Sequence, residues 1–368
     1  MEFNLVKYLS NGVETIIKSA MKATIKNPRE SLFLANFYRA TKTAGNVRKS
    51  MEEKGEHIPP FLIASITSVC NLHCKGCYAR ANHACGEEEM SCSMTSDEWG
   101  KIFKEAEELG ISFILLAGGE PLMRKDILKT AADYKNIIFP IFTNGTMFTD
   151  EYIELFHKNR NLVPIVSIEG REELTNRRRG EGVYQQLTHA MDKLQEKQII
   201  FGASVTVTKD NLMEVTNNKF LNLLYEQGCK VVIYVEYVPV DEKTSDLAPG
   251  DLERDYLNNR LSELRNVQDG MIFISFPGDE KSSGGCLAAG RGFFHINASG
   301  GAEPCPFSPY SDISVRTEGI RKSLQSTLFC KLQSEEILLA DHVGGCVLFE
   351  QKNQVEAMLK SKNEMMQE

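Results

Sequence analysis

The sequence has no long uninterrupted apolar run and no excess of positive charge. A membrane-spanning helix needs about 18 consecutive apolar residues, and no segment of the 368-residue chain comes near that length. The amino-terminal residues lack the apolar core and small-residue cleavage site of a secretory signal. The formal charge of -8 is the wrong sign for a nucleic-acid partner. These absences predict a cytoplasmic protein with no transmembrane segment and no nucleic acid among its partners.

The first 50 residues differ from the rest of the chain in charge. They hold nine Lys or Arg and three Glu. Apolar residues at helical spacing predict helices over 3–24 and 29–53, separated by Pro28. We expect residues 1–58 to form a helical extension packed on the body of the protein. The alternative is peripheral membrane contact, in which the basic amphipathic first helix touches anionic lipid.

Cysteine is abundant, and in a reducing compartment ten cysteines indicate metal ligands or catalysis more than disulfides. Cys70, Cys74 and Cys77 form a C-x3-C-x2-C cluster just after the apolar run 61–66. Three thiolates this close can hold three irons of a cubane cluster and leave the fourth iron open to a small molecule. A zinc site is the rival interpretation, but structural zinc takes four Cys or His ligands and only three are local here.

Short β-rich runs alternate with amphipathic helices from residue 60 to 240, which is typical of βα units around a parallel sheet. The predicted strands are 61–67, 112–117, 137–142, 163–168, 200–207 and 230–237. The predicted helices between them are 96–109, with Ser96 as its N-cap, 124–135, 149–159, 183–197 and 211–227. The fold class is therefore α/β, a partial (β/α)6 TIM-like barrel over residues 59–245.

The pattern changes beyond this barrel. A helix is predicted over 250–268 and a short strand over 271–276, followed by a glycine-rich segment. We expect a small C-terminal α+β domain over 246–350 and a helical tail over 351–368.

Residues that follow the predicted strands carry the polar motifs. Ligands of parallel α/β folds bind at the carboxyl ends of the strands. The cysteine cluster follows the first strand, Gly118-Gly119-Glu120-Pro121 the second and Thr143-Asn144-Gly145-Thr146 the third. Two glycines let the backbone come close to a ligand, and Glu120 offers a carboxylate to an ammonium group. All of this chemistry is expected at one mouth of the barrel.

The cysteine spacing, followed by GGEP and TNG at successive strand ends, resembles the radical S-adenosylmethionine (radical SAM) superfamily over about residues 60–240. The resemblance implies a 4Fe-4S cluster on Cys70, Cys74 and Cys77, whose open iron binds S-adenosyl-L-methionine. It implies that the cofactor is held by Gly118, Gly119, Glu120, Asn144 and Val238, with Arg179 and Ser204 as further candidates. For Arg179, which lies in the run 177–179, the alternative is a solvated basic loop.

The resemblance is incomplete at one position of the cysteine cluster. Many members have an aromatic residue directly before the third cysteine, whereas this chain has Gly76 there and Tyr78 directly after it. The packing over the cluster is therefore the part of the resemblance that this departure puts in question.

A second cysteine group lies near the C-terminus. Cys286, thirteen residues, Gly300, four residues and Cys305 resemble the opening of the SPASM/twitch auxiliary-cluster domains, with a hairpin expected over 293–304. This resemblance implies a second iron-sulfur cluster of the twitch type, with Cys346 as the third ligand. Cys330, in an apolar context, is the weaker candidate.

The sequence thus predicts a radical SAM enzyme, an oxidoreductase or a transferase, that abstracts hydrogen from a peptide, a sugar or a lipid-like substrate. Glu169 and Glu236 are candidate bases, although salt bridging is as good an interpretation of each. A reducing electron donor such as ferredoxin or flavodoxin is the expected partner. Cys85 and Cys92 are expected to be free thiols. The alternative from another class is an iron-sulfur carrier or scaffold without radical chemistry, and a methyltransferase using the same radical is a third possibility.

Overall fold

The computed structural model describes residues 5–23, 28–240, 242–267, 270–276, 283–339 and 346–365. The outermost positions of three predicted helical segments lie outside the described residues, namely 3–4 with 24, 268, and 366–368.

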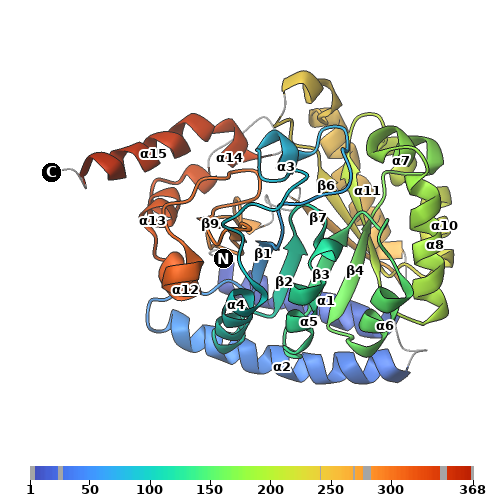
Figure 1. Ribbon diagram of the computed structural model, residues 1–368, viewed down its shortest axis with the longest axis horizontal. Coiled ribbons are helices and arrows are strands. Elements are labelled where there is room, and N and C mark those ends of the chain that lie inside the picture. The colour runs from blue at the N-terminus through green and yellow to red at the C-terminus, as the bar shows by residue number, and fades with distance from the viewer. Residues whose placement is uncertain are drawn as a thin grey trace.

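One curled sheet of nine strands dominates the molecule (Figure 1), in the order β7-β6-β5-β4-β3-β2-β1-β8-β9. The strands are β1 Phe61–Ser65, β2 Phe113–Ala117, β3 Phe139–Thr143, β4 Leu162–Ser167, β5 Gly202–Val207, β6 Val231–Glu236, β7 Ile272–Phe276, β8 His295–Ile296 and β9 Ala302–Glu303. Neighbouring strands from β7 to β1 are parallel, β8 runs parallel to β1, and β9 closes the edge as an antiparallel hairpin with β8. The six strands predicted for the barrel are all present, and the curled half-barrel confirms the predicted fold class.

Helices precede the sheet, connect its strands and follow it. The helices up to β6 are α1 Leu5–Ala23, α2 Pro28–Glu52, α3 Tyr78–Ala81, α4 Ser96–Glu108, α5 Lys125–Ala132, α6 Asp150–Lys158, α7 Glu172–Arg179, α8 Val183–Glu196, α9 Leu212–Val215 and α10 Asn218–Glu226. Those after it are α11 Asp251–Val267, α12 Val315–Ser323, α13 Thr327–Ser334, α14 Val347–Glu350 and α15 Lys352–Met365. Short 3-10 turns are η1 Pro121–Met123, η2 Glu242–Leu247 and η4 Ile337–Leu339.

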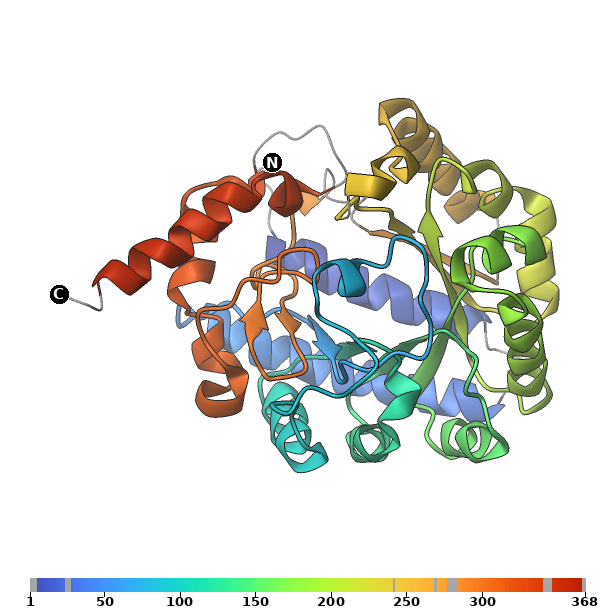
Figure 2. The same cartoon turned by 45° about the horizontal axis from the view of Figure 1, so that its top comes forward.

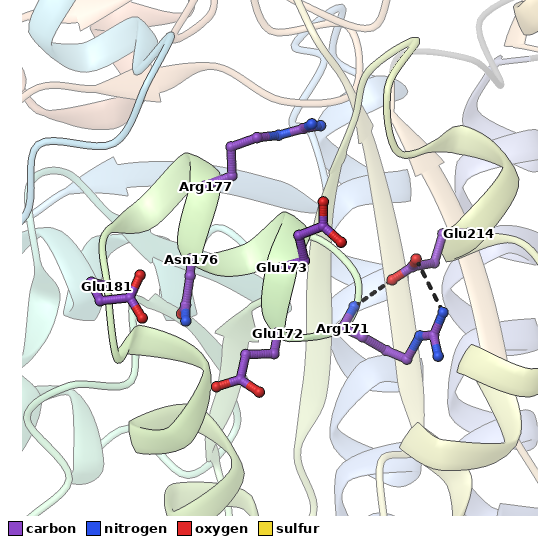
Figure 3. A pocket seen from close by; sticks show the side chains of 7 residues that line it. All are labelled: Arg171, Glu172, Glu173, Asn176, Arg177, Glu181 and Glu214. Atoms are coloured by element: carbon purple, nitrogen blue, oxygen red, sulfur yellow. Dashed lines mark hydrogen bonds and ion pairs between the residues drawn. The ribbon is translucent and has the colours of Figure 1, made fainter.

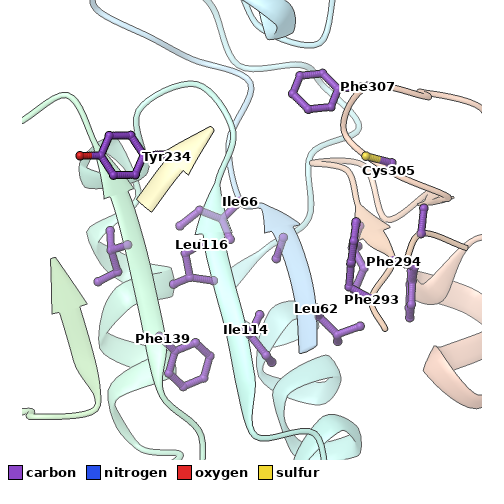
Figure 4. Close-up of a cluster of buried hydrophobic side chains, with 14 of the residues drawn as sticks. Leu62, Ile66, Ile114, Leu116, Phe139, Tyr234, Phe293, Phe294, Cys305 and Phe307 are labelled. Atoms are coloured by element: carbon purple, nitrogen blue, oxygen red, sulfur yellow. The ribbon is translucent and has the colours of Figure 1, made fainter. Parts of the chain in front are cut away.

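Alternation along the strands gives the sheet two faces. Leu116 of β2 lies opposite Ile141 of β3, and both are completely buried with Phe103 of α4 in the main apolar core. Their neighbours along each strand point to the other, inner face of the curl, because successive side chains of a strand alternate. Figure 4 shows core side chains of β1, β2 and β3 beside those of the C-terminal segment, such as Phe294. One continuous core therefore serves both parts of the chain.

α1 and α2 run together across the amino ends of the strands (Figure 1). Val13 and Ile17 of α1 and Phe37 of α2 are buried against Phe113 and Ile138, in a small core of their own. The apolar face of α1 is thus used to close the bottom of the barrel, as a packed cap would require. That face is not available to a lipid surface. No helix in the described ranges combines the length and the apolar character needed to cross a membrane.

Three local predictions are wrong in detail. The N-cap of α4 is Thr95, not Ser96, because Thr95 and Glu98 form a reciprocal capping box. The region 211–227 is two helices, α9 and α10, since the Asn217 side chain caps a new start by accepting from the Phe220 N–H. The arginine run 177–179 ends the helix α7 and is not a loop.

The sheet crosses the position at which a domain boundary was predicted, between residues 245 and 246. β7 pairs with β6, and the β8–β9 hairpin pairs with β1 at the other edge. The turn residues predict the hairpin, but only the structure shows that it pairs with β1. The four-part domain division stays a prediction.

Candidate active site at the carboxyl ends of the strands

The loop that carries Cys70, Cys74 and Cys77 lies across the open end of the curled sheet, as Figure 2 shows around α3. Backbone hydrogen bonds fix it on two sides: Cys70 N donates to the Gly86 carbonyl at 3.0 Å and Lys75 N to the Arg178 carbonyl at 2.8 Å. All three cysteines are partly buried. The loop therefore presents three partly buried cysteines from a fixed backbone.

The three thiols differ in their surroundings. Burial raises the pKa of Cys70, whereas a hydrogen bond with the Cys85 thiol lowers the pKa of Cys77 to about 5. The same contact raises the pKa of Cys85. Among the described residues, no three His, Cys, Asp or Glu side chains are gathered around the position of a single metal ion. A cubane cluster does not require that arrangement, because each thiolate binds a different iron.

Gly118 and Gly119 lie against the backbone that leads into the cysteine loop. A Cβ atom at Gly118, where φ is +124°, would lie 3.2 Å from Thr67 N, and one at Gly119 would lie 2.9 Å from Cys70 N. Gly119 N also donates to the Thr67 carbonyl at 3.0 Å. The predicted role of these glycines is to let the backbone come close to a ligand. The structure shows that they also allow β2 to pack directly on the cysteine loop.

Glu120 connects the ends of two strands. Its buried carboxylate accepts from Leu122 N at 3.0 Å, from Thr143 Oγ1 at 2.7 Å and from Asn144 N at 2.7 Å. Burial raises its pKa, partly offset by these three donors. A carboxylate has about four acceptor sites, so about one remains for a further donor.

Asn144 connects β3 to the cysteine loop. Its Nδ2 donates to Asn71 Oδ1 at 2.8 Å, and its Oδ1 accepts from Thr146 N and Oγ1. Asn71 lies between the first two cysteines. The strand ends after β1, β2 and β3 thus form one hydrogen-bonded unit, as the strand-end rule predicted.

Arg178 and Arg179 bind the same carboxylate. Glu169 Oε1 accepts from Arg178 Nη1 at 2.5 Å and from Arg179 Nε and Nη2 at 2.9 and 2.5 Å, and its Oε2 accepts from Thr206 N at 3.2 Å. Three of these four donors come from the two arginines, so the Glu169 carboxylate holds both guanidinium groups, as the salt-bridge interpretation predicted.

The two arginines are the basic element of the site. Burial alone would lower the pKa of Arg179, but the charges of Glu169, Cys74 and Cys77 raise it, so its guanidinium stays charged close to the cysteine loop. The Nε of Arg178 is buried and has no hydrogen-bond partner among the described residues.

The remaining predicted residues divide between the two faces of the sheet. Ser204 of β5 lies opposite Ser167 of β4, on the inner face. Val238, two residues beyond the end of β6, is buried. Glu236 alternates with inward-facing Val235 and accepts from Arg254 Nε of α11 at 2.6 Å, on the outer face. The placement predicted for Glu236, at the barrel mouth, is therefore wrong.

The second cysteine group comes from three segments that contact one another. Cys286, Cys305 and Cys346 are all buried, whereas Cys330 on α13 is exposed. Cys286 N donates to the Leu338 carbonyl of η4, and Ala289 N donates to the Pro304 carbonyl. Cys346 is the N-cap residue of α14, which packs on η4. This burial favours the three predicted ligands over Cys330.

Three residues that the sequence analysis did not single out link the hairpin to β1. His295 Nδ1 lies 2.7 Å from Glu303 Oε2, and His295 Nε2 lies 2.8 Å from Ser65 Oγ. His295 pairs in register with Ile63, so this buried group shares the inner face with Ser65. His295 and Glu303 alternate with apolar residues in the hairpin, but only the pairing of β8 with β1 brings Ser65 to them.

A hollow of about 620 Å³ lies beside α7 (Figure 3). It is lined by Arg171, Glu172, Glu173, Asn176, Arg177, Glu181 and Glu214. The lining includes none of the residues predicted to bind a cluster or S-adenosylmethionine, and it is polar and highly charged. It therefore adds nothing to the site at the strand ends.

Comparison with known proteins identifies the family to which this geometry corresponds. The Radical SAM superfamily matches residues 64–217, a range that includes the cysteine loop and the motifs at the ends of β2 and β3. Residues 64–217 are therefore a radical SAM domain. Members of this superfamily use a 4Fe-4S cluster and S-adenosylmethionine, and this radical SAM protein is an enzyme.

Two curated relatives differ in how much of each chain they share with this one. The AdoMet-dependent heme synthase of Methanosarcina barkeri is 26% identical over 310 residues, which is 76% of this chain and 86% of that protein. The sporulation killing factor maturation protein SkfB of Bacillus subtilis is also 26% identical, over 44% of this radical SAM chain and 39% of its own length. The similarity to SkfB is thus confined to part of each protein.

A solved structure shows the same fold over most of the chain. SuiB of Streptococcus suis superposes with a TM-score of 0.65 at 17% identity, and covers 84% of this chain and 73% of its own. At that identity the likeness shows a shared fold.

Proposed function

We propose that this radical SAM enzyme binds a 4Fe-4S cluster through Cys70, Cys74 and Cys77 and holds S-adenosylmethionine beside it at the carboxyl ends of the strands. The observation that carries the proposal is the hydrogen-bonded unit that joins the cysteine loop to the ends of β2 and β3, through Gly119, Glu120 and Asn144. When bound there, the reduced cluster would supply the electron for reductive cleavage of S-adenosylmethionine, which is the source of the radical for hydrogen abstraction from substrate.

The residues present fit the cofactor's charged groups. The remaining acceptor site of Glu120 suits the ammonium group of the methionine moiety. The unpartnered Arg178 Nε, together with the charged Arg179, suits the carboxylate. In this arrangement Glu169 is a positioning residue, because it fixes both guanidinium groups.

Asn144, Ser204 and Val238 are proposed to contact the rest of S-adenosylmethionine. Ser204 lies on the inner face, and Asn144 and Val238 lie at the ends of β3 and β6. All three residues are buried, which supports a role in a site shielded from water.

Cys286, Cys305 and Cys346 are proposed to hold a second iron-sulfur cluster of the SPASM/twitch type. Their burial in contacting segments supports the proposal, since thiolates that bind a structural cluster need a site shielded from solvent. Tyr78 and Phe307, each one or two residues from a proposed ligand, pack edge to face at 5.1 Å between ring centroids. This contact joins the loop of the first cysteine group to the segment that carries Cys305.

The test is cleavage of S-adenosylmethionine by anaerobically reconstituted, reduced enzyme, with 5′-deoxyadenosine as the measured product. We expect cleavage, with flavodoxin or dithionite as the electron source. A protein that carries a full cluster and forms no 5′-deoxyadenosine would refute the proposal and favour the iron-sulfur carrier, which would be tested by transfer of iron to an apo-protein acceptor.

The substrate class is best sought by stimulation of the same assay. The names of the relatives point to tetrapyrrole and peptide chemistry, and sugars and lipid-like molecules complete the panel. A true substrate raises 5′-deoxyadenosine formation and, when deuterated at the reacting carbon, transfers deuterium into it.

A further inference from the structure

The contact between Tyr237 and Gly76 accounts for the missing aromatic residue of the cysteine motif. Gly76 lies between Cys74 and Cys77 with a φ of +68°. A Cβ atom built there would lie 2.8 Å from Cε2 and 2.9 Å from Cζ of Tyr237, and closer still to its hydroxyl. The Tyr237 ring thus occupies the space into which any side chain at position 76 would project.

Tyr237 is held in this place independently of the loop. It is buried and directly follows β6, its backbone N donates to the Val207 carbonyl at 3.0 Å, and its hydroxyl lies 2.6 Å from Thr244 Oγ1. A tyrosine fixed at both ends is a rigid surface for a loop to pack against.

We propose that Tyr237 is the aromatic cover of the cysteine loop in this enzyme, and that it positions residues 74–77 relative to the end of β6. The inference rests on the proposed function. Val238, the next residue, is proposed to contact the far end of the same S-adenosylmethionine molecule, so one ring fixes the spacing between the two ends of the cofactor site. Tyr237 is a positioning residue and need not touch the cofactor.

The first experiment measures S-adenosylmethionine binding by equilibrium dialysis on reconstituted enzyme, together with the change in the reduced cluster's EPR spectrum when the cofactor is added. We expect Tyr237→Ala to weaken binding about 10-fold and to diminish the EPR change, as loss of an outer-shell partner does. Tyr237→Phe, which keeps the ring, should stay within about twofold of the wild type.

Tyr134→Ala is the matched control. Tyr134 also packs a ring in the core and donates its hydroxyl to a backbone carbonyl, that of Gly100, but it lies on the helical side of the sheet. Its loss should lower stability and leave both cofactor readouts unchanged.

The second experiment is a double-mutant cycle on the thermal stability of the apoprotein. Gly76→Ala should destabilise the wild type through both its φ and the clash with the ring, but should cost clearly less in the Tyr237→Ala background. Equal costs in the two backgrounds would overturn the contact, and wild-type cofactor binding by folded Tyr237→Ala would overturn the positioning role. If the wild type itself does not bind S-adenosylmethionine, the proposed function fails, while the cycle still tests the contact.

Discussion

The two cysteine groups are built in opposite ways. Cys70, Cys74 and Cys77 come from one short loop and are partly exposed at the open end of the sheet. Cys286, Cys305 and Cys346 are buried and come from three segments that contact one another. A site that must admit a cofactor keeps its ligands accessible, whereas a site that holds its group permanently can enclose it. The difference supports the proposal of cofactor chemistry for the first group and of a structural or electron-storing role for the second.

The largest effect is expected from the first group. Cys74→Ala should lower 5′-deoxyadenosine formation by more than about 100-fold, because it removes a direct ligand of the proposed cluster. About four irons per chain should remain on the second group. Iron counting beside the activity assay checks both values. Complete loss of iron would mean that the two groups are not separate sites.

Substitution in the second group should affect iron content and stability more than cleavage of S-adenosylmethionine. Cys305→Ala should remove about four irons per chain and lower stability, yet leave cleavage of S-adenosylmethionine without substrate at no less than about half of the wild-type rate. Cys330→Ala is the control, since Cys330 is exposed on α13 and should change neither iron content nor rate. Iron loss in Cys330→Ala would show that Cys330 is a ligand, either in place of Cys346 or as a fourth ligand.

The two buried arginines of the first site should depend on the Glu169 carboxylate for their counter-charge. Glu169→Gln leaves Arg178 and Arg179 buried without their counter-charge, which should cost about 3 kcal/mol of folding free energy and weaken S-adenosylmethionine binding. Urea unfolding and equilibrium dialysis measure the two effects. The control is Glu172→Gln, at an exposed position of α7, the helix that carries both arginines. It should change the free energy of unfolding by less than about 0.5 kcal/mol.

The smallest effect concerns the thiols of the apoprotein. With a pKa of about 5, Cys77 is a thiolate at pH 7, and its alkylation rate should fall only as the pH drops toward 5. Cys85→Ala removes the hydrogen bond that lowers this pKa, so the pKa rises and alkylation of Cys77 at pH 7 should slow about 10-fold. Mass spectrometry of iodoacetamide-treated apoprotein follows each cysteine. Unchanged alkylation of Cys77 would show that Cys85 does not set its reactivity.

The sequence predicted the barrel well because its signals are local. Each strand from β1 to β6 is a short apolar run, and each predicted motif follows such a run directly. Its failures are at positions where side chains meet across the fold. In the sequence, Glu169 and Glu236 are both carboxylates near strand ends, which suits a base and an ion pair equally. Only their partners in the structure, Arg178 and Arg179 for Glu169 and Arg254 for Glu236, show that both form ion pairs.

The departure at Gly76 shows the same limit. From the sequence it was a missing aromatic residue, because Tyr237 lies 161 positions further along the chain. Only the packing of the end of β6 on the cysteine loop shows that a ring is present there after all.

By itself the sequence determined the order of strands and helices, the cysteine spacing of the first cluster and the meeting of GGEP and TNG at one mouth. These follow from residue periodicity and from the rule that parallel strands end on the same side. Tertiary structure decided which face Glu236 takes, that the β8–β9 hairpin extends the sheet at β1, and that Tyr237 covers Gly76. Those outcomes depend on contacts between residues far apart in the chain, and such contacts are fixed only when the whole core packs.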